Sequence, residues 1–129
     1  MSSDDGGAHF AVTSKALSSL PDYELTNSSI NSVPGFEGHV WVTTKKELAQ
    51  STDGGKTFRT ISGIEEAHAL GFGHAAPGQK YPALYLAGKI GGVTGFFRSD
   101  DTAASFVRIN DDAHQYGGST VITGDPRVY

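Results

Sequence analysis

A short polar motif recurs in this chain at an interval of 48 residues, and that interval constrains the fold more than any other feature. The motif reads Ser-x-Asp-x-(Gly/Ala)-x-x-Phe and occupies residues 3–10, 51–58 and 99–106, which places its aspartates at Asp5, Asp53 and Asp101. A fixed period of about 20–50 residues indicates a protein built from structural repeats. We therefore expect each copy to hold the same position in a repeated unit, and we name the copies the first, second and third Asp box.

The Asp box has the composition of a tight turn between two strands. Serine and aspartate oxygens can accept hydrogen bonds from the turn's backbone, and Gly54-Gly55 permits positive φ angles at the reversal. The phenylalanine begins the next strand and is expected to anchor it in a core. Because the aspartate recurs in every copy, a structural role is favoured over a catalytic one for Ser3, Asp5, Phe10, Ser51, Asp53, Gly55, Thr57, Phe58, Ser99, Asp101, Ser105 and Phe106.

Strand-like sequence surrounds each box. The clearest repeat predicts strands at residues 67–72, 83–88, 95–98 and 106–109. The preceding repeat predicts strands at 39–43, 47–50 and 58–61, with a first strand somewhere within 23–33. One four-stranded antiparallel sheet per repeat of this length is typical of a β-propeller blade. The predicted fold class is therefore all-β, built from four-stranded antiparallel blades.

The same period divides the chain into unequal parts. We expect the end of one blade at residues 1–13, full blades at 14–62 and 63–110, and the start of another at 111–129, with a strand at 120–123. A propeller closes with about four to eight blades. Two full and two partial blades therefore need other blades as partners, either in cis or by self-association.

Composition excludes several classes of partner. The net charge of −4 argues against nucleic acid and anionic membranes. The chain has no apolar run long enough for a transmembrane helix, and its N-terminus lacks a signal-peptide pattern. There is no cysteine, and the five histidines lack metal-ligand spacing. We therefore expect neither a metal nor a cofactor.

The loop that follows the third box is the best candidate for binding. Residues 110–116 are polar, are not repeated elsewhere, and lie between predicted blades, where loops carry function. Tyrosine and histidine can stack on sugar rings, while amides supply hydrogen bonds, so the candidate residues are Asn110, His114, Gln115 and Tyr116. The alternative is that these groups only stabilise the loop. Trp41, the single tryptophan, is expected to pack between blades rather than to bind sugar.

Several stretches of the chain resemble glycoside hydrolase family 74. The similar segments are residues 69–88, 97–101, 108–118 and 122–129, which look like the C-terminal part of those enzymes. The resemblance implies xyloglucanases or reducing-end-specific cellobiohydrolases, with two propellers and a cleft for a β-1,4-glucan. It also implies two aspartates that act as acid and base with inversion. Neither aspartate maps onto this chain, so no catalytic residue is assigned here.

Two functions remain open from the sequence. The first is a segment of the C-terminal propeller of a secreted, xyloglucan-hydrolysing enzyme, forming part of the substrate cleft without the catalytic acids. The second is a non-catalytic Asp-box module, natural or engineered, that closes by self-association or binds a carbohydrate or a protein. Whether the chain alone is an enzyme, and whether its parent cuts within chains or at their ends, stays open.

Overall fold

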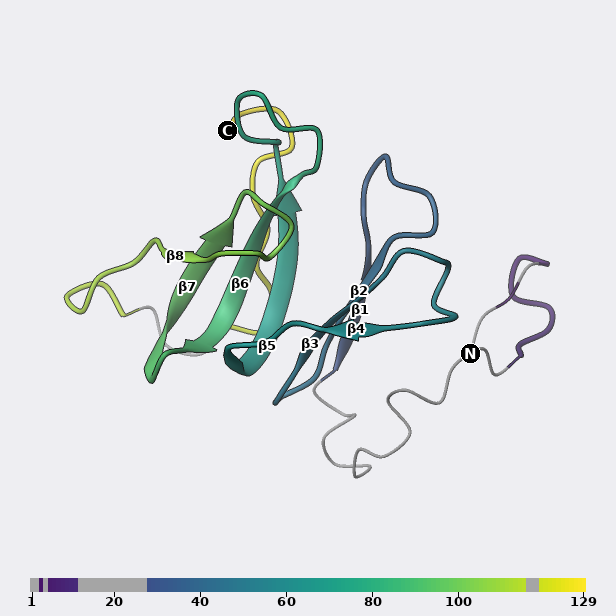
Figure 1. Cartoon of the computed structure of the whole chain (residues 1–129), viewed down its shortest axis with the longest axis horizontal. Coiled ribbons are helices and arrows are strands. Elements are labelled where there is room, and N and C mark those ends of the chain that lie inside the picture. Colours follow the sequence, from purple (N-terminus) through teal and green to yellow (C-terminus); the bar gives the residue numbers. More distant parts are fainter. Residues whose placement is uncertain (1–2, 4, 12–27, 116–118) are drawn as a thin grey trace.

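The computed structural model describes residues 3, 5–11, 28–115 and 119–129, and it contains two four-stranded antiparallel sheets (Figure 1). Sheet 1 consists of β1 (Ser29–Ser32), β2 (Val40–Thr43), β3 (Leu48–Ser51) and β4 (Arg59–Thr60), in that order. Sheet 2 consists of β5 (Ile64–Gly73), β6 (Ala83–Ile90), β7 (Val93–Ser99) and β8 (Val107–Arg108), also in chain order. This arrangement confirms the all-β fold class. The described residues include no helix long and apolar enough to cross a membrane.

The central strands of sheet 1, β2 and β3, are buried over nearly their whole length. Trp41 stands opposite Asn31 of β1 and Gln50 of β3, so the three share one face of the sheet. Trp41 and Leu48 are completely buried. β1 is the strand whose position the sequence left uncertain. It carries a single apolar residue, Ile30, so its pattern is weak, and backbone pairing with β2 fixes it.

Sheet 2 has longer strands than its sequence pattern indicates. β5 starts at Ile64 rather than at residue 67, because its first residues pair with β6 across two register shifts, between Ile64 and Glu66 and between Ala67 and Ala69. Such bulges keep a strand paired while they bend it. β8 is shorter than expected and covers only Val107–Arg108.

One core joins the two sheets. Leu70, Leu86 and Phe97 stand opposite one another on β5, β6 and β7 and therefore share a face of sheet 2. That face packs with buried residues of sheet 1, including Trp41 and Leu48. In Figure 1 β5 is the strand of sheet 2 that lies beside sheet 1, and it contacts β1, β2 and β3. The stability of each sheet therefore depends on the other.

The second and third Asp boxes form the turns that precede β4 and β8, respectively. In the second box the Ser51 hydroxyl donates to Asp53 Oδ1 (2.8 Å) and accepts from the Gly55 amide (2.9 Å). Asp53 also accepts from the Thr57 amide (2.9 Å) and the Thr57 hydroxyl (2.6 Å). The third box repeats all four bonds with Ser99, Asp101, Ala103 and Ser105. The first box also repeats them, with the His9 ring replacing the hydroxyl.

The phenylalanines of the boxes differ in their burial. Phe106 packs against the core and Phe58 is half-buried, but Phe10 is 64% exposed. The expected anchoring of Phe10 is therefore wrong for this structure. In Figure 1 the first box lies apart from both sheets. The strand predicted after this box falls largely outside the described residues.

The segment 119–129 returns along β5 without forming a regular strand. The Gly124 amide donates to the Phe72 carbonyl (3.2 Å), and the His74 amide donates to the Asp125 carbonyl (2.7 Å). The segment lies so close to sheet 2 that a Cβ added to Gly71 would come within 1.9 Å of the Ile122 carbonyl oxygen. The expectation of a regular strand at 120–123 is therefore wrong. The segment packs closely against the glycines of β5 and forms no regular hydrogen-bond ladder with it.

Candidate functional site

The candidate loop begins where β8 ends, and Asn110 fixes its start. The Asn110 Oδ1 atom accepts from the Phe96 amide of β7 (2.8 Å) and from Arg108 Nε (3.3 Å). Gly95 leaves room for this contact, since a Cβ there would lie 2.6 Å from Asn110 Oδ1. Asn110 thus links the loop to β7, and its side-chain oxygen already accepts two hydrogen bonds from the protein.

Asp111 and His114 close the loop into a turn. The Asp111 Oδ1 atom accepts from the backbone amides of Ala113 (3.0 Å) and His114 (2.8 Å) and lies 2.6 Å from His114 Nδ1. The side-chain hydrogen bond with His114 is the main cause that lowers the pKa of Asp111, which therefore stays ionised near neutral pH. The turn holds the His114 ring in one orientation on an exposed surface.

Asp112 links the loop to β8. Its Oδ1 atom lies 2.8 Å from Arg108 Nη1 and accepts a weaker hydrogen bond from Gln115 Nε2 (3.4 Å). The structure therefore brings Asn110, His114 and Gln115 into one bonded loop. Tyr116 falls outside the described residues. Figure 1 shows the loop beyond β8, at the outer edge of sheet 2 and away from β5.

The box aspartates are unsuited to proton transfer near neutral pH. Hydrogen bonds from the Thr57 hydroxyl and amide hold the pKa of Asp53 far below its usual value of 3.8. The His9 amide and the Ser3 hydroxyl lower the pKa of Asp5 to about 2. For Asp101 partial burial acts to raise the pKa, but hydrogen bonds from Ser105 and Ser99 outweigh it and the pKa is lowered. All three are bound as anions within their turns.

Trp41 lies inside the molecule and offers no surface to a ligand. It is fully buried between the sheets, where its strand pattern predicts it, and its indole N–H donates to the Tyr81 hydroxyl (3.0 Å). Within the described residues, no group of three histidine, cysteine or acidic side chains could hold a metal ion.

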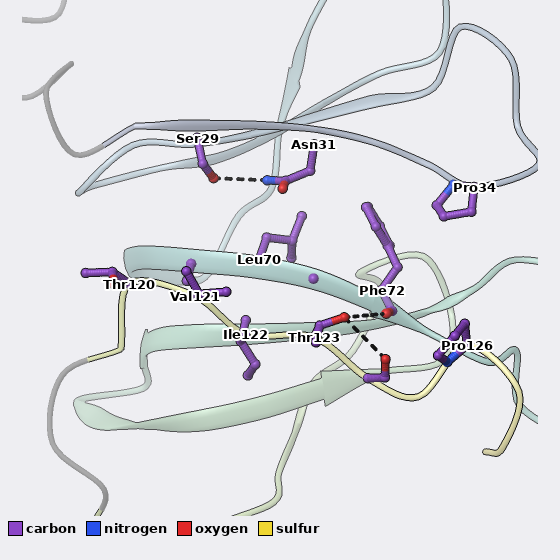
Figure 2. Close-up of a pocket in the computed structure, with 13 residues that line it drawn as sticks. Ser29, Asn31, Pro34, Leu70, Phe72, Thr120, Val121, Ile122, Thr123 and Pro126 are labelled. Atoms are coloured by element: carbon purple, nitrogen blue, oxygen red, sulfur yellow. Dashed lines mark hydrogen bonds between the residues drawn. The ribbon is translucent and has the colours of Figure 1, made fainter.

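A cavity that the sequence did not indicate lies between β1 and β5, and Figure 2 shows its lining. Its volume is about 470 Å³. Three separate segments meet there, which is why no single motif reveals it. The described residues that line it include no acidic side chain and are Ser29, Asn31, Pro34, Ala69, Leu70, Gly71, Phe72, Thr120, Val121, Ile122, Thr123, Gly124 and Pro126.

Three polar side chains around this cavity, those of Ser29, Asn31 and Thr123, are already paired. Asn31 Nδ2 donates to Ser29 Oγ (3.0 Å), which in turn lies 2.7 Å from the Thr43 hydroxyl. The Thr123 hydroxyl donates to the Phe72 carbonyl (3.4 Å), as Figure 2 shows. The cavity is thus a space between three neighbouring segments, and the described residues of its lining form no convergent set of reactive side chains.

Curated relatives of this chain include xyloglucanases. No family model matches the sequence. A xyloglucanase of Paenibacillus sp is 49% identical over 131 residues, which cover 97% of this chain and 12% of that protein. The xyloglucanase Xgh74A of Acetivibrio thermocellus is 52% identical over 129 residues, covering 98% of this chain and 15% of that protein. This chain thus spans only a small part of these relatives.

Solved structures give the same result. The crystal structure of the GH74 enzyme of Niastella koreensis matches with a TM-score of 0.75 and 41% identity, over 78% of this chain and 15% of that one. The GH74 xyloglucanase of Xanthomonas campestris matches with a TM-score of 0.70 and 41% identity, over 80% of this chain and 14% of that one. Both the sequence and the fold of this chain correspond to a segment of such enzymes.

Proposed function

Because the chain belongs to glycoside hydrolase family 74, as a segment of its propeller, we propose that it forms part of the wall of a xyloglucan-binding cleft. The loop at residues 110–116 supplies the contacts with the glucan. The observation that carries this assignment is the construction of the loop: His114 and Gln115 are exposed, non-repeated and held by Asp111 and Asp112. Preorganised polar groups on a rigid scaffold are typical of binding sites.

The catalytic acid and base of the parent enzyme lie outside this chain in our proposal. An inverting pair needs one protonated carboxyl group that faces the leaving-group oxygen and one carboxylate that activates a water on the opposite face of the sugar. The box aspartates are engaged in their turns, and Asp111 and Asp112 are engaged by His114 and Arg108. The cavity between β1 and β5 has no carboxylate among the described residues of its lining. The full-length protein is then a secreted hydrolase, to which this segment contributes binding.

Titration of the chain with a xyloglucan oligosaccharide tests the binding role. We expect His114→Ala combined with Gln115→Ala to weaken binding about tenfold, because each lost hydrogen bond contributes about 0.5–1.5 kcal/mol. Gln79→Ala, which changes an exposed glutamine on the β5–β6 loop, is the matched control and leaves the affinity unchanged. Equal affinity in the double variant and the control contradicts the proposal.

The second candidate is an assembly module that associates with further blades through its ends. Apolar side chains there are exposed: Phe10 at 64%, Val121 at 78% and Val128 at 67%. Light scattering on a sizing column separates this candidate from the first. A mass at a small multiple of 13.6 kDa supports self-association, and a monomer mass removes it.

A further inference from the structure

The hydroxyl of Tyr81 is the polar centre of the contact between the two sheets. Tyr81 lies near the end of the loop that joins β5 to β6. Its side chain contacts two residues in the strands of sheet 1 and one in the turn between β1 and β2. Its oxygen lies 3.0 Å from Trp41 Nε1, 3.3 Å from His39 Nδ1 and 3.4 Å from Gln50 Nε2. We call these four residues the Tyr81 junction.

Counting donors and acceptors fixes the proton on His39. A tyrosine hydroxyl has one hydrogen to donate and two lone pairs that accept. The Trp41 indole can only donate. The Gln50 amide also donates, because its other end, Oε1, accepts from the Arg59 guanidinium (2.8 Å) and so turns Nε2 toward Tyr81. Both lone pairs are then occupied, and the hydroxyl hydrogen remains for His39 Nδ1, which must carry no proton.

We propose that the Tyr81 junction is a pH-sensitive latch between the two sheets, closed when His39 is neutral and weakened when His39 is protonated. A protonated imidazole carries hydrogens on both ring nitrogens. His39 Nδ1 would then present a third donor to an oxygen that already receives two. One donor loses its partner, and an unpaired polar group in a largely buried contact is unfavourable.

The surroundings of His39 do not offset this conflict. In the described part of the chain no carboxylate forms an ion pair with His39. Phe36 instead packs against both rings, with centroid distances of 5.4 Å to His39 and 4.7 Å to Tyr81. The charged residues on the turn, box, strand and loop that meet at the junction are Glu37, Asp53, Lys56, Arg59 and Lys80. Of these, Arg59 is held on Gln50 and Asp53 on Thr57.

Fluorescence of the chain between pH 8 and pH 5 tests the latch, because Trp41 is the only tryptophan and belongs to the junction. We expect a reversible change in Trp41 emission within this pH interval. The thermal midpoint should fall by about 5 °C over the same interval. His39→Asn keeps an acceptor in place of Nδ1 but does not titrate, so it should abolish both changes. Tyr81→Phe removes the shared oxygen and should also abolish them.

Two results overturn the proposal. One is a Trp41 emission that does not change with pH in the original chain. A pH response that persists unchanged in His39→Asn counts in the same way, because it would belong to the other histidines. The other comes from ¹⁵N NMR of the imidazole rings at pH 7.5. The latch requires the neutral His39 ring to carry its proton on Nε2, and a proton on Nδ1 contradicts it whatever the stability of the variants.

Discussion

At the scale of single residues, the three Asp boxes form a natural series of substitutions in one turn. The first and second boxes place glycines at the two positions with positive φ, whereas the third uses Thr102 (φ 58°) and Ala103 (φ 66°). L-residues in this region are disfavoured by about 1–2 kcal/mol, and a β-branched residue is an outlier. The bonds around Asp101 therefore hold a backbone that its own sequence disfavours.

Replacing Thr102 with glycine should stabilise the chain. We expect a gain of about 0.5–1 kcal/mol, because relief of the left-handed strain exceeds the extra backbone freedom of glycine in the unfolded chain. Urea denaturation measures the difference. Ala103→Gly is the matched control: it relieves similar strain but removes a methyl that is only 8% exposed in the core, so its net change should be near zero. A loss of stability in Thr102→Gly contradicts this reading.

The bound carboxylates predict how the boxes respond to acid. The folded-state pKa of Asp53 is lowered from 3.8 by hydrogen bonds from Thr57 and Ser51, so the ionised form favours folding. This contribution is complete above pH 5, where Asp53 is ionised in both states, and is lost progressively as the pH falls below 3.8 toward the folded-state pKa. Asp53→Asn should lack it. We expect the stability difference between the two chains to shrink steadily from pH 5 to pH 2, and a constant difference would argue against the assignment.

At the scale of elements, small residues on β5 let the segment 119–129 lie directly on sheet 2. A Cβ at Gly71 would lie 1.9 Å from the Ile122 carbonyl oxygen, and one at Gly73 would lie 3.0 Å from the Gly124 Cα. Tyr129 then reaches the far end of β7, where its hydroxyl donates to Asp100 (2.9 Å) and its ring lies under Arg98. The side-chain hydrogen bond to Asp100 raises the pKa of Tyr129.

Gly71→Ala should detach this segment. We expect a loss of about 1–3 kcal/mol, because the backbone of Ile122 and Thr123 must move away from the new methyl. Hydrogen exchange locates the effect: the amides of His74 and Gly124 should lose protection. The Ile61 amide, which donates to Leu48 in sheet 1 (2.8 Å), should keep it and is the internal control. Unchanged protection at His74 would mean that the segment does not depend on Gly71.

The repeat period predicts the strands well but not the contacts between repeats. The strands around Trp41 and Leu84 follow from short continuous runs of apolar residues, and the sequence places them within a few residues. The first strand of sheet 1 is poorly defined because Ser29–Ser32 has one apolar side chain. The Tyr81 junction and the cavity combine segments about 30–90 residues apart in the sequence, so no local pattern reports them. For the same reason the composition of the sequence identifies the candidate loop but does not predict its bonds to β7 and β8.

At the scale of the whole molecule, the shared core makes the two sheets one cooperative unit. Leu84 and Leu86 are fully buried on the face of sheet 2 that packs with Trp41 and Leu48.

Leu84→Ala should lower the free energy of unfolding by about 2–5 kcal/mol. Because the core is common to both sheets, Trp41 fluorescence in sheet 1 and far-UV circular dichroism should report the same lowered midpoint. Exposed Val107→Ala, a truncation on β8, is the control and should change stability little. Separate transitions would show that the sheets unfold independently.

The most direct test of the central claim is an NMR titration of the ¹⁵N-labelled chain with a xyloglucan oligosaccharide at millimolar concentration. Binding at the candidate loop predicts saturable shifts in the amides of His114 and Gln115 and in the side-chain amide of Asn110, with small shifts at the Asp boxes. Shifts confined to the cavity between β1 and β5, or no saturable shift anywhere, would contradict the assignment of the loop as part of a glucan-binding wall.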